Sequence, residues 1–202
     1  INKIALSLLL IGLPFSSFAG TLLEKTFQHG GITREYEIYL PDGLPENAPL
    51  VFVLHGRTSR NEWVRGHSQM NDVADQGSFA VCYPQGTSAK MPGIDEEPKP
   101  HWNVHLTYMD VDDVGFFKAL IQYFKTDYNI DSDKIFSSGM SLGGFMSYRL
   151  ACELEEINGI GSVTGSHAVY YTCNPPNKKN IIHFHGNSDI VVPYYGTSWS
   201  VP

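Results

Sequence analysis

The sequence predicts an α/β fold in which a mostly parallel sheet is covered by helices on both faces. Continuously apolar runs, which are typical of central strands buried on both faces, recur along the chain. Segments with a helical pattern separate them, and strands that alternate with helices form parallel sheets. The apolar runs lie at residues 50–54, 79–83, 135–138 and 181–184, with a weaker one at 161–164.

The remaining elements are predicted from their periodicity. Residues 34–40 alternate polar and apolar side chains, which indicates a half-exposed antiparallel strand. Residues 113–124 place apolar side chains at helical spacing after acidic residues that suit a helix N-terminus. Another helical stretch begins near His67. The 202 residues are enough for one domain with a sizeable core, which we expect to span 20–202.

The first 19 residues have the features of an export signal. Lys3 precedes an apolar run that breaks at Pro14, and small residues lead to Ala19. A membrane anchor is the alternative, but a span needs about 20 apolar residues. We therefore expect cleavage after Ala19, a secreted or periplasmic protein, and no stable membrane insertion after cleavage.

Charge limits the classes of partner. The formal net charge of −7 argues against nucleic acid or an anionic membrane, since both select basic patches. The acidic run at 110–113 resembles a metal site only superficially and fits helix capping better. The sequence therefore predicts no nucleic-acid partner and no metal site.

The three cysteines have different expected roles. Export permits disulfides. Cys152 lies on a predicted helix and Cys173 on the loop after the next strand, so the two elements should be neighbours. We predict a Cys152–Cys173 bridge, provided that the geometry permits it. Cys82, inside an apolar run, is interpreted as a small buried hydrophobic residue, or one that lacks its partner.

The segment 139–143, Gly-Met-Ser-Leu-Gly, stands between a predicted strand and a predicted helix. A turn this tight needs residues with almost no side chain beside the serine, and Gly139 and Gly143 meet that need. The turn raises the Ser141 hydroxyl above the sheet edge and points the helix N-terminus at any oxyanion formed there. This context favours a catalytic serine over a structural glycine turn.

The loop after residues 50–54 is a second candidate. Acyl transfer places negative charge on the carbonyl oxygen, and backbone N–H groups that are fixed in advance stabilise it well. We expect the N–H groups of Leu142 and Arg57 to form this oxyanion hole. The Arg57 side chain either contacts substrate or points to solvent. His55 is interpreted as a buried histidine that holds the loop by hydrogen bonds.

The loop after the last apolar run carries Asp189 behind a glycine turn. The acid of a Ser-His-Asp triad lies on such a loop and holds an imidazole in one tautomer. A surface Asx-turn is the other interpretation. The chain order, serine before aspartate, favours Asp189 as the triad acid. His183 and His185 are interpreted as structural.

The loop 85–103 is long and rich in proline and glycine. Loops of this kind often shape a substrate pocket, so Trp102 and Asn103 are candidate substrate contacts. Trp102 either stacks on an aromatic or sugar ring or anchors the loop in the core, and the sequence leaves both open. Trp63 has the same ambiguity.

Taken together, these motifs resemble those of the secreted esterases grouped with polyhydroxybutyrate depolymerases, feruloyl esterases and acetylxylan esterases. The resemblance implies an α/β-hydrolase fold, Ser141 as nucleophile, Asp189 as acid, a Cys152–Cys173 bridge and no cofactor. It also implies an ester-linked polymer or oligomer as substrate, either polyhydroxybutyrate or a feruloylated or acetylated polysaccharide. The matching segments are residues 49–56, 112–116, 139–144 and 185–194.

The triad histidine of that family follows the acid, and this chain departs from the pattern there. A serine without a neighbouring base is a poor nucleophile. We therefore expect a C-terminally truncated esterase that lacks the last strand and helix, rather than a relative that has lost its base. The alternatives are a polymer-binding protein that uses the Trp102 loop and an acyltransferase that uses the same serine. The eight histidines all precede Asp189: His29, His55, His67, His101, His105, His167, His183 and His185.

Overall fold

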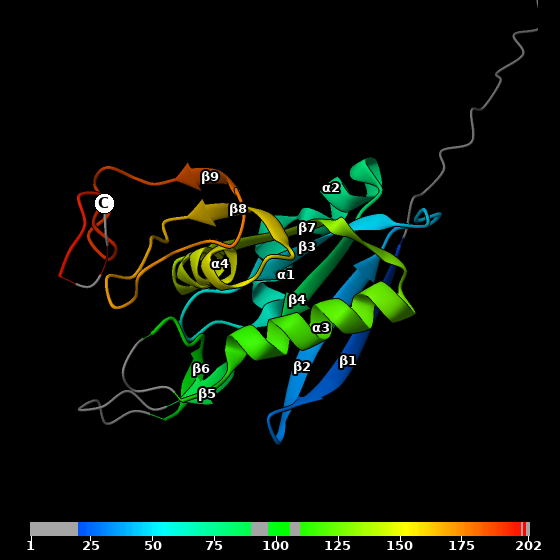
Figure 1. The fold of residues 1–202 in the computed structure, drawn as a ribbon, viewed down its shortest axis with the longest axis horizontal. Coiled ribbons are helices and arrows are strands. Elements are labelled where there is room, and N and C mark those ends of the chain that lie inside the picture. The colour runs from blue at the N-terminus through cyan, green and yellow to red at the C-terminus, as the bar shows by residue number, and fades with distance from the viewer. Residues whose placement is uncertain (1–19, 90–96, 106–109, 199, 201–202) are drawn as a thin grey trace, which may run out of the picture.

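The computed structural model describes residues 20–89, 97–105, 110–198 and 200. A seven-stranded sheet forms the centre, in the order β1-β2-β4-β3-β7-β8-β9 (Figure 1). β2 pairs antiparallel with β1 and β4, and all other neighbours are parallel, which confirms the mostly parallel sheet. The strands are β1 Thr21–His29, β2 Ile32–Leu40, β3 Ala48–Leu54, β4 Ala80–Pro84, β7 Ile130–Met140, β8 Ile157–Val163 and β9 Asn180–Phe184.

Helices cover both faces of the sheet, as predicted. Two separate apolar clusters show this arrangement. The larger cluster packs α3 and α4 on the sheet, with Phe52 and Phe117 in edge-to-face contact at its centre. The smaller cluster packs Val64 and Ala74, from α1 and α2, on the other face. The helices are α1 Asn61–Ser68, α2 Met70–Gly77, α3 Asp113–Asp127 and α4 Leu142–Glu153.

Two parts of the fold differ from the prediction. The edge strand β1 was not predicted, because it lies on the surface and its side chains show no sustained apolar alternation. The segment predicted as an irregular loop contains a short antiparallel hairpin, β5 Thr87–Ala89 with β6 Lys99–His101. This hairpin follows β4 and carries the chain back toward the carboxyl ends of the parallel strands (Figure 1).

β9 was predicted as a buried strand. The strand is present, but the prediction that it is buried was wrong. The strand pairs with β8 in parallel register, but all five of its residues are exposed, with Ile182 at 61% and Phe184 at 62%. It is the last strand of the sheet, and α4 reaches it through the Tyr148 hydroxyl, which bonds His183, without covering its apolar side chains. A continuously apolar strand suits burial on both faces, and this position does not provide it.

Cys82 lies fully buried in β4 with a free thiol, and burial raises the pKa of that thiol well above its usual value. It therefore packs as a small apolar residue, as expected.

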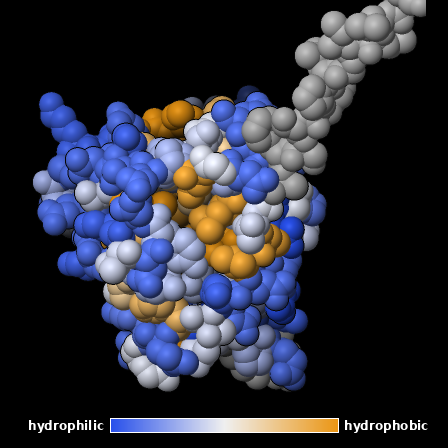
Figure 2. Space-filling view, turned by 90° about the vertical axis from the view of Figure 1, so that its right-hand side faces the viewer, coloured by the Kyte–Doolittle hydropathy of each residue, from blue (hydrophilic) through white to orange (hydrophobic). Residues whose placement is uncertain are grey.

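The predicted export signal, residues 1–19, lies outside the described residues. None of the helices that the structure describes is long and apolar enough to cross a membrane. The face shown in Figure 2 is mostly hydrophilic, with apolar side chains gathered in small patches.

Candidate active site

Ser141 occupies the sharp turn between β7 and α4. Its backbone has φ 54° and ψ −121°, a conformation that residues other than glycine rarely adopt. Such strain costs about 1–3 kcal/mol and persists only where the surrounding structure holds it. Hydrogen bonds hold it here: the Ser141 N–H donates to the Val163 carbonyl at 2.8 Å, and the Ser141 carbonyl accepts from the Gly144 N–H at 2.8 Å.

The glycines on either side of the serine are required by close backbone contacts. A Cβ atom on Gly139 would lie 2.4 Å from the backbone of Gly143. A Cβ atom on Gly143 would lie 2.3 Å from the carbonyl oxygen of Leu54, at the end of β3. Real Cβ atoms essentially never come this close to other atoms. The turn therefore has the steric form that the sequence motif predicted.

A cavity of about 910 Å³ opens at Ser141. It lies at the carboxyl ends of β3 and β7, where open α/β sheets place their ligands. Its walls come from the loop after β3, from α1, from the serine turn and from the loop after β9. The lining residues are Gly56, Arg57, Thr58, Ser59, Arg60, Glu62, Trp63, Met140, Ser141 and Val191.

The predicted oxyanion donors flank the serine. Leu142 is the first residue of α4, where N–H groups have no partner within the helix and the helix dipole favours negative charge. The loop that carries Arg57 passes close by, since a Cβ atom on Gly56 would lie 3.5 Å from the Ser141 Cβ. The Arg57 Nε donates to His101 Nε2 at 3.0 Å, so the side chain is held against the hairpin. The donor roles stay predictions.

His55 is a fully buried structural residue, as expected. Its Nδ1–H donates to the Gly56 carbonyl at 2.7 Å, and its Nε2 accepts the Gly86 N–H at 2.9 Å. The imidazole is therefore neutral, and its two nitrogens hold the loops after β3 and β4 together. Burial lowers the pKa of His55 from 6.5 to about 4.

This lowered pKa predicts a specific loss of stability in acid. The unfolded chain binds a proton at His55 below about pH 6.5, whereas the folded chain resists it until about pH 4, so the His55 contribution is present above pH 6.5 and is lost toward pH 4. The loss amounts to about 3 kcal/mol in the free energy of unfolding. Urea unfolding at several pH values in this range should show that the free energy of unfolding depends less on pH in His55→Gln than in the wild type. Parallel curves, or an imidazole NMR titration near pH 6.5, would contradict the prediction.

Of the two roles that the sequence left open for Trp102, its burial favours the anchor in the core over a contact with substrate. Its side chain is 0% exposed, and its Nε1–H donates to the His55 carbonyl at 2.9 Å. Asn103 is also engaged: its N–H donates to Asp113 Oδ2 at 2.7 Å and its Nδ2–H donates to the Val111 carbonyl at 2.9 Å. Neither residue lines the cavity. Both residues therefore anchor the loop. The Trp102 ring fills a place in the core, and Asn103 is held by its hydrogen bonds.

Asp113 forms a buried ion pair that the sequence did not reveal. Its Oδ1 lies 2.7 Å from the Nη2 atom of the Arg34 guanidinium, and both side chains are almost fully buried. The Arg34 guanidinium also lies 4.1 Å from the centre of the Phe116 ring. Asp112 caps α3 by accepting the Gly115 N–H, which confirms capping as the role of this acidic run. The pair therefore fastens α3 to β2 behind the site.

Asp189 lies on the loop after β9. Its Oδ1 accepts the N–H groups of Val191 at 2.8 Å and Val192 at 2.9 Å, and these two hydrogen bonds lower the pKa of the carboxyl group. The Asx-turn therefore exists, and it also keeps the carboxylate ionised and oriented. Because Val191 lines the cavity together with Ser141, the loop borders the serine. The catalytic role of Asp189 stays a prediction.

The two histidines of β9 and its loop support the Asp189 loop, in agreement with the structural role expected. The His185 Nε2–H donates to the Val192 carbonyl at 2.6 Å, and its Nδ1 accepts from His183 Nε2 at 3.0 Å. The Tyr148 hydroxyl of α4 bonds His183 Nδ1 at 2.9 Å. Among the cavity walls that the structure describes, none is a histidine.

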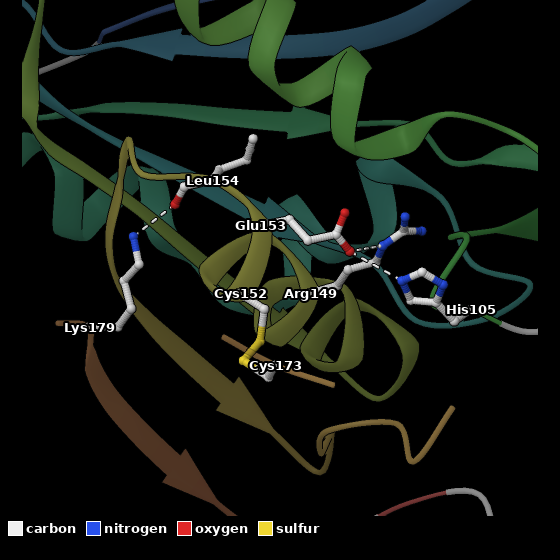
Figure 3. The surroundings of a disulfide bond; sticks show 7 residues. All are labelled: His105, Arg149, Cys152, Glu153, Leu154, Cys173 and Lys179. Atoms are coloured by element: carbon white, nitrogen blue, oxygen red, sulfur yellow. Dashed lines mark hydrogen bonds and ion pairs between the residues drawn. A yellow bond between two sulfur atoms is a disulfide. The ribbon is translucent and has the colours of Figure 1, made fainter. Parts of the chain in front are cut away.

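The predicted Cys152–Cys173 disulfide is present and ties the loop after β8 to α4, with the two Cα atoms 5.2 Å apart (Figure 3). Nearby, the Lys179 ammonium donates to the Leu154 carbonyl at the end of the helix, at 2.8 Å. His167 lies close enough to both sulfurs to form a group of potential metal ligands. Because the sulfurs are bonded to each other, they offer no thiolate to a metal.

Known proteins share this architecture. No family model matches the chain. It is 30% identical over 173 residues to the putative esterase NocK of Nocardia uniformis subsp. tsuyamanensis, covering 83% of this chain and 48% of that one. It is 29% identical over 180 residues to a probable feruloyl esterase C of Aspergillus niger, covering 87% and 62%. A bifunctional acetylxylan esterase/xylanase of Neocallimastix patriciarum is 25% identical, with 81% and 22% covered. The chain thus spans less than two thirds of each relative.

Solved structures agree on the fold. A thermostable esterase superposes with a TM-score of 0.62 at 20% identity, covering 87% of this chain and 49% of that one. An acetyl xylan esterase from Aspergillus awamori has a TM-score of 0.61 at 22% identity, covering 78% and 58%. The protein has the α/β-hydrolase fold, as the sequence implied.

Proposed function

We propose that the protein is a serine ester hydrolase. The observation that carries this proposal is Ser141, which is held in a strained turn between β7 and α4 at the wall of a large cavity. A serine in a turn between strand and helix, with glycines packed against the turn, stands where an α/β-hydrolase carries its nucleophile. Relatives named as esterases support the same reaction class.

The proposed reaction is acyl transfer in two steps through Ser141. The Ser141 Oγ attacks the ester carbonyl carbon, and its proton passes to a histidine base oriented by Asp189. The N–H groups of Leu142 and Arg57 stabilise the oxyanion. The alcohol leaves with the proton from the base, and water then hydrolyses the acyl-enzyme by the same steps.

The base is the part of this mechanism that residues 1–202 do not supply. The structure buries His55 in the core, and the His185 Nε2, which lies 3.6 Å from Asp189 Oδ2, donates to the Val192 carbonyl. No histidine follows Asp189 in these 202 residues. The proposal therefore assigns the nucleophile to Ser141 and the acid to Asp189, and it leaves the base unassigned.

The proposed substrate is a feruloyl or acetyl ester on a polysaccharide rather than polyhydroxybutyrate. Relatives are named feruloyl and acetylxylan esterases, and none of those compared above is named a depolymerase. A polymeric substrate also suits the export signal predicted in residues 1–19. The alternative of polymer binding through Trp102 loses its basis, because that ring is fully buried.

Covalent labelling of the protein tests the nucleophile. A fluorophosphonate forms an Oγ–P bond with an activated serine and releases fluoride. We expect about one equivalent of label on the peptide that contains Ser141, none on Ser141→Ala, and unchanged labelling of Ser132→Ala, a serine at the other end of β7. Labelling of a different residue, or none, would contradict the proposal.

A further inference from the structure

We propose that Trp63 is a stacking platform that binds a ring of the substrate ester beside Ser141. This inference rests on the proposed function and identifies how that site selects its substrate. Trp63 lies on α1 and lines the same cavity as Ser141. Its side chain is 43% exposed, so a large part of the indole faces solvent or a ligand.

The packing of α1 does not account for this exposure. The next residue, Val64, is the buried one, and it joins the smaller apolar cluster on the sheet. α1 is further anchored by the Asn61 N–H, which donates to Gln85 Oε1 at 3.0 Å. Trp63 therefore points away from the core that holds its helix. A large aromatic side chain left at a cavity wall is typical of a binding surface.

His67 holds the indole in place from behind. One helical turn after Trp63, its ring stacks on the indole with centroids 3.7 Å apart and planes 20° from parallel. Its Nδ1–H donates to the Trp63 carbonyl at 3.0 Å, which fixes the imidazole orientation. His67 does not line the cavity, although Trp63 does. The imidazole therefore covers one face of the indole, and the proposal places the ligand on the part of the indole that is exposed and lines the cavity.

The other walls indicate what kind of ring fits. Met140 and Val191 add apolar surface around Ser141. At the rim, the exposed ion pair of Arg60 and Glu62, 3.2 Å apart, offers donors and acceptors. This combination suits a flat ring with an apolar face and a hydroxylated edge. Two sources share that chemistry, the phenolic ring of a feruloyl group and the sugar ring of the alcohol.

Kinetics of the Trp63→Ala protein distinguish these sources. Methyl ferulate carries the ring in the acyl group, acetylated xylotriose carries it in the alcohol, and ethyl acetate has none. We expect kcat/KM to fall about three- to tenfold for at least one ring-bearing ester, to stay unchanged for ethyl acetate, and to be largely retained in Trp63→Phe. Val73→Ala, an exposed apolar residue on α2, is the matched control. An equal fall for ethyl acetate, or no fall for either ring-bearing ester, would overturn the platform.

A binding measurement separates this proposal from the proposed function. In Ser141→Ala, titration with ferulate or xylotriose should change indole fluorescence, and the change should disappear when Trp63 is also replaced by phenylalanine. Retained hydrolysis by Ser141→Ala with this fluorescence change would refute the nucleophile and leave the platform intact. Absence of the change with both ligands would overturn the platform whatever the hydrolytic activity.

Discussion

Replacement of Ser141 by alanine is expected to lower kcat/KM for ester hydrolysis by about a thousandfold or more. Alanine removes the Oγ that forms the acyl-enzyme and leaves the neighbouring backbone unchanged. The substitution adds no atoms to the turn, so the free energy of unfolding should change little. The rate of product release from methyl ferulate and from acetylated xylan measures the effect.

Two further measurements make this result specific to Ser141. Pre-steady-state assays of the wild type with p-nitrophenyl acetate should show a burst of nitrophenol about equal to the enzyme concentration, if release of the acyl group is slow. The burst should be absent in Ser141→Ala and retained in Ser132→Ala. Equal turnover by wild type and Ser141→Ala would show that the reaction, if any, uses another residue.

Replacement of Gly143 by alanine is expected to destabilise the fold by about 3 kcal/mol and to abolish hydrolysis. The new Cβ would lie 2.3 Å from the Leu54 carbonyl oxygen and 2.7 Å from that of His55. Both oxygens belong to the backbone, and β3 is held in register with β7, so moving either oxygen would cost free energy. Relief requires the serine turn to separate from β3, which would displace Ser141 from the oxyanion donors.

Gly186→Ala is the matched control for this effect. It lies in the loop before Asp189, and a Cβ there would meet nothing within 4 Å. Its free energy of unfolding should stay within about 0.5 kcal/mol of the wild type. Urea denaturation of both variants measures the difference. Wild-type stability in Gly143→Ala would contradict the close packing between the turn and β3.

The elements that the sequence predicted well are those whose signal is local. Apolar runs identified the central strands, and glycines around Ser141 identified the turn, because the steric need for glycine is visible in a few neighbouring residues. The Cys152–Cys173 bridge was also predictable, since both cysteines lie on elements adjacent in the expected topology. The strand β1 was missed because a surface edge strand needs no regular apolar pattern.

The functional environment was less predictable because it depends on contacts between distant segments. Trp63 and Trp102 were indistinguishable in the sequence, each near a loop and each able to bind a ring. The fold buries Trp102 against the His55 carbonyl and leaves Trp63 at the cavity wall. The Arg34–Asp113 pair joins residues far apart in the chain and shows no local pattern.

The sequence by itself determined the fold class, the strained position of Ser141 and the disulfide, because strand burial, glycine sterics and chain order are written in short stretches of residues. Tertiary structure alone decided which aromatic ring enters the core, how Asp189 is held and which side chains surround Ser141. These outcomes depend on how the loop after β3 packs on the loop after β4 and borders one cavity with the loop after β9. No single segment carries that information, since each loop takes its shape from the others.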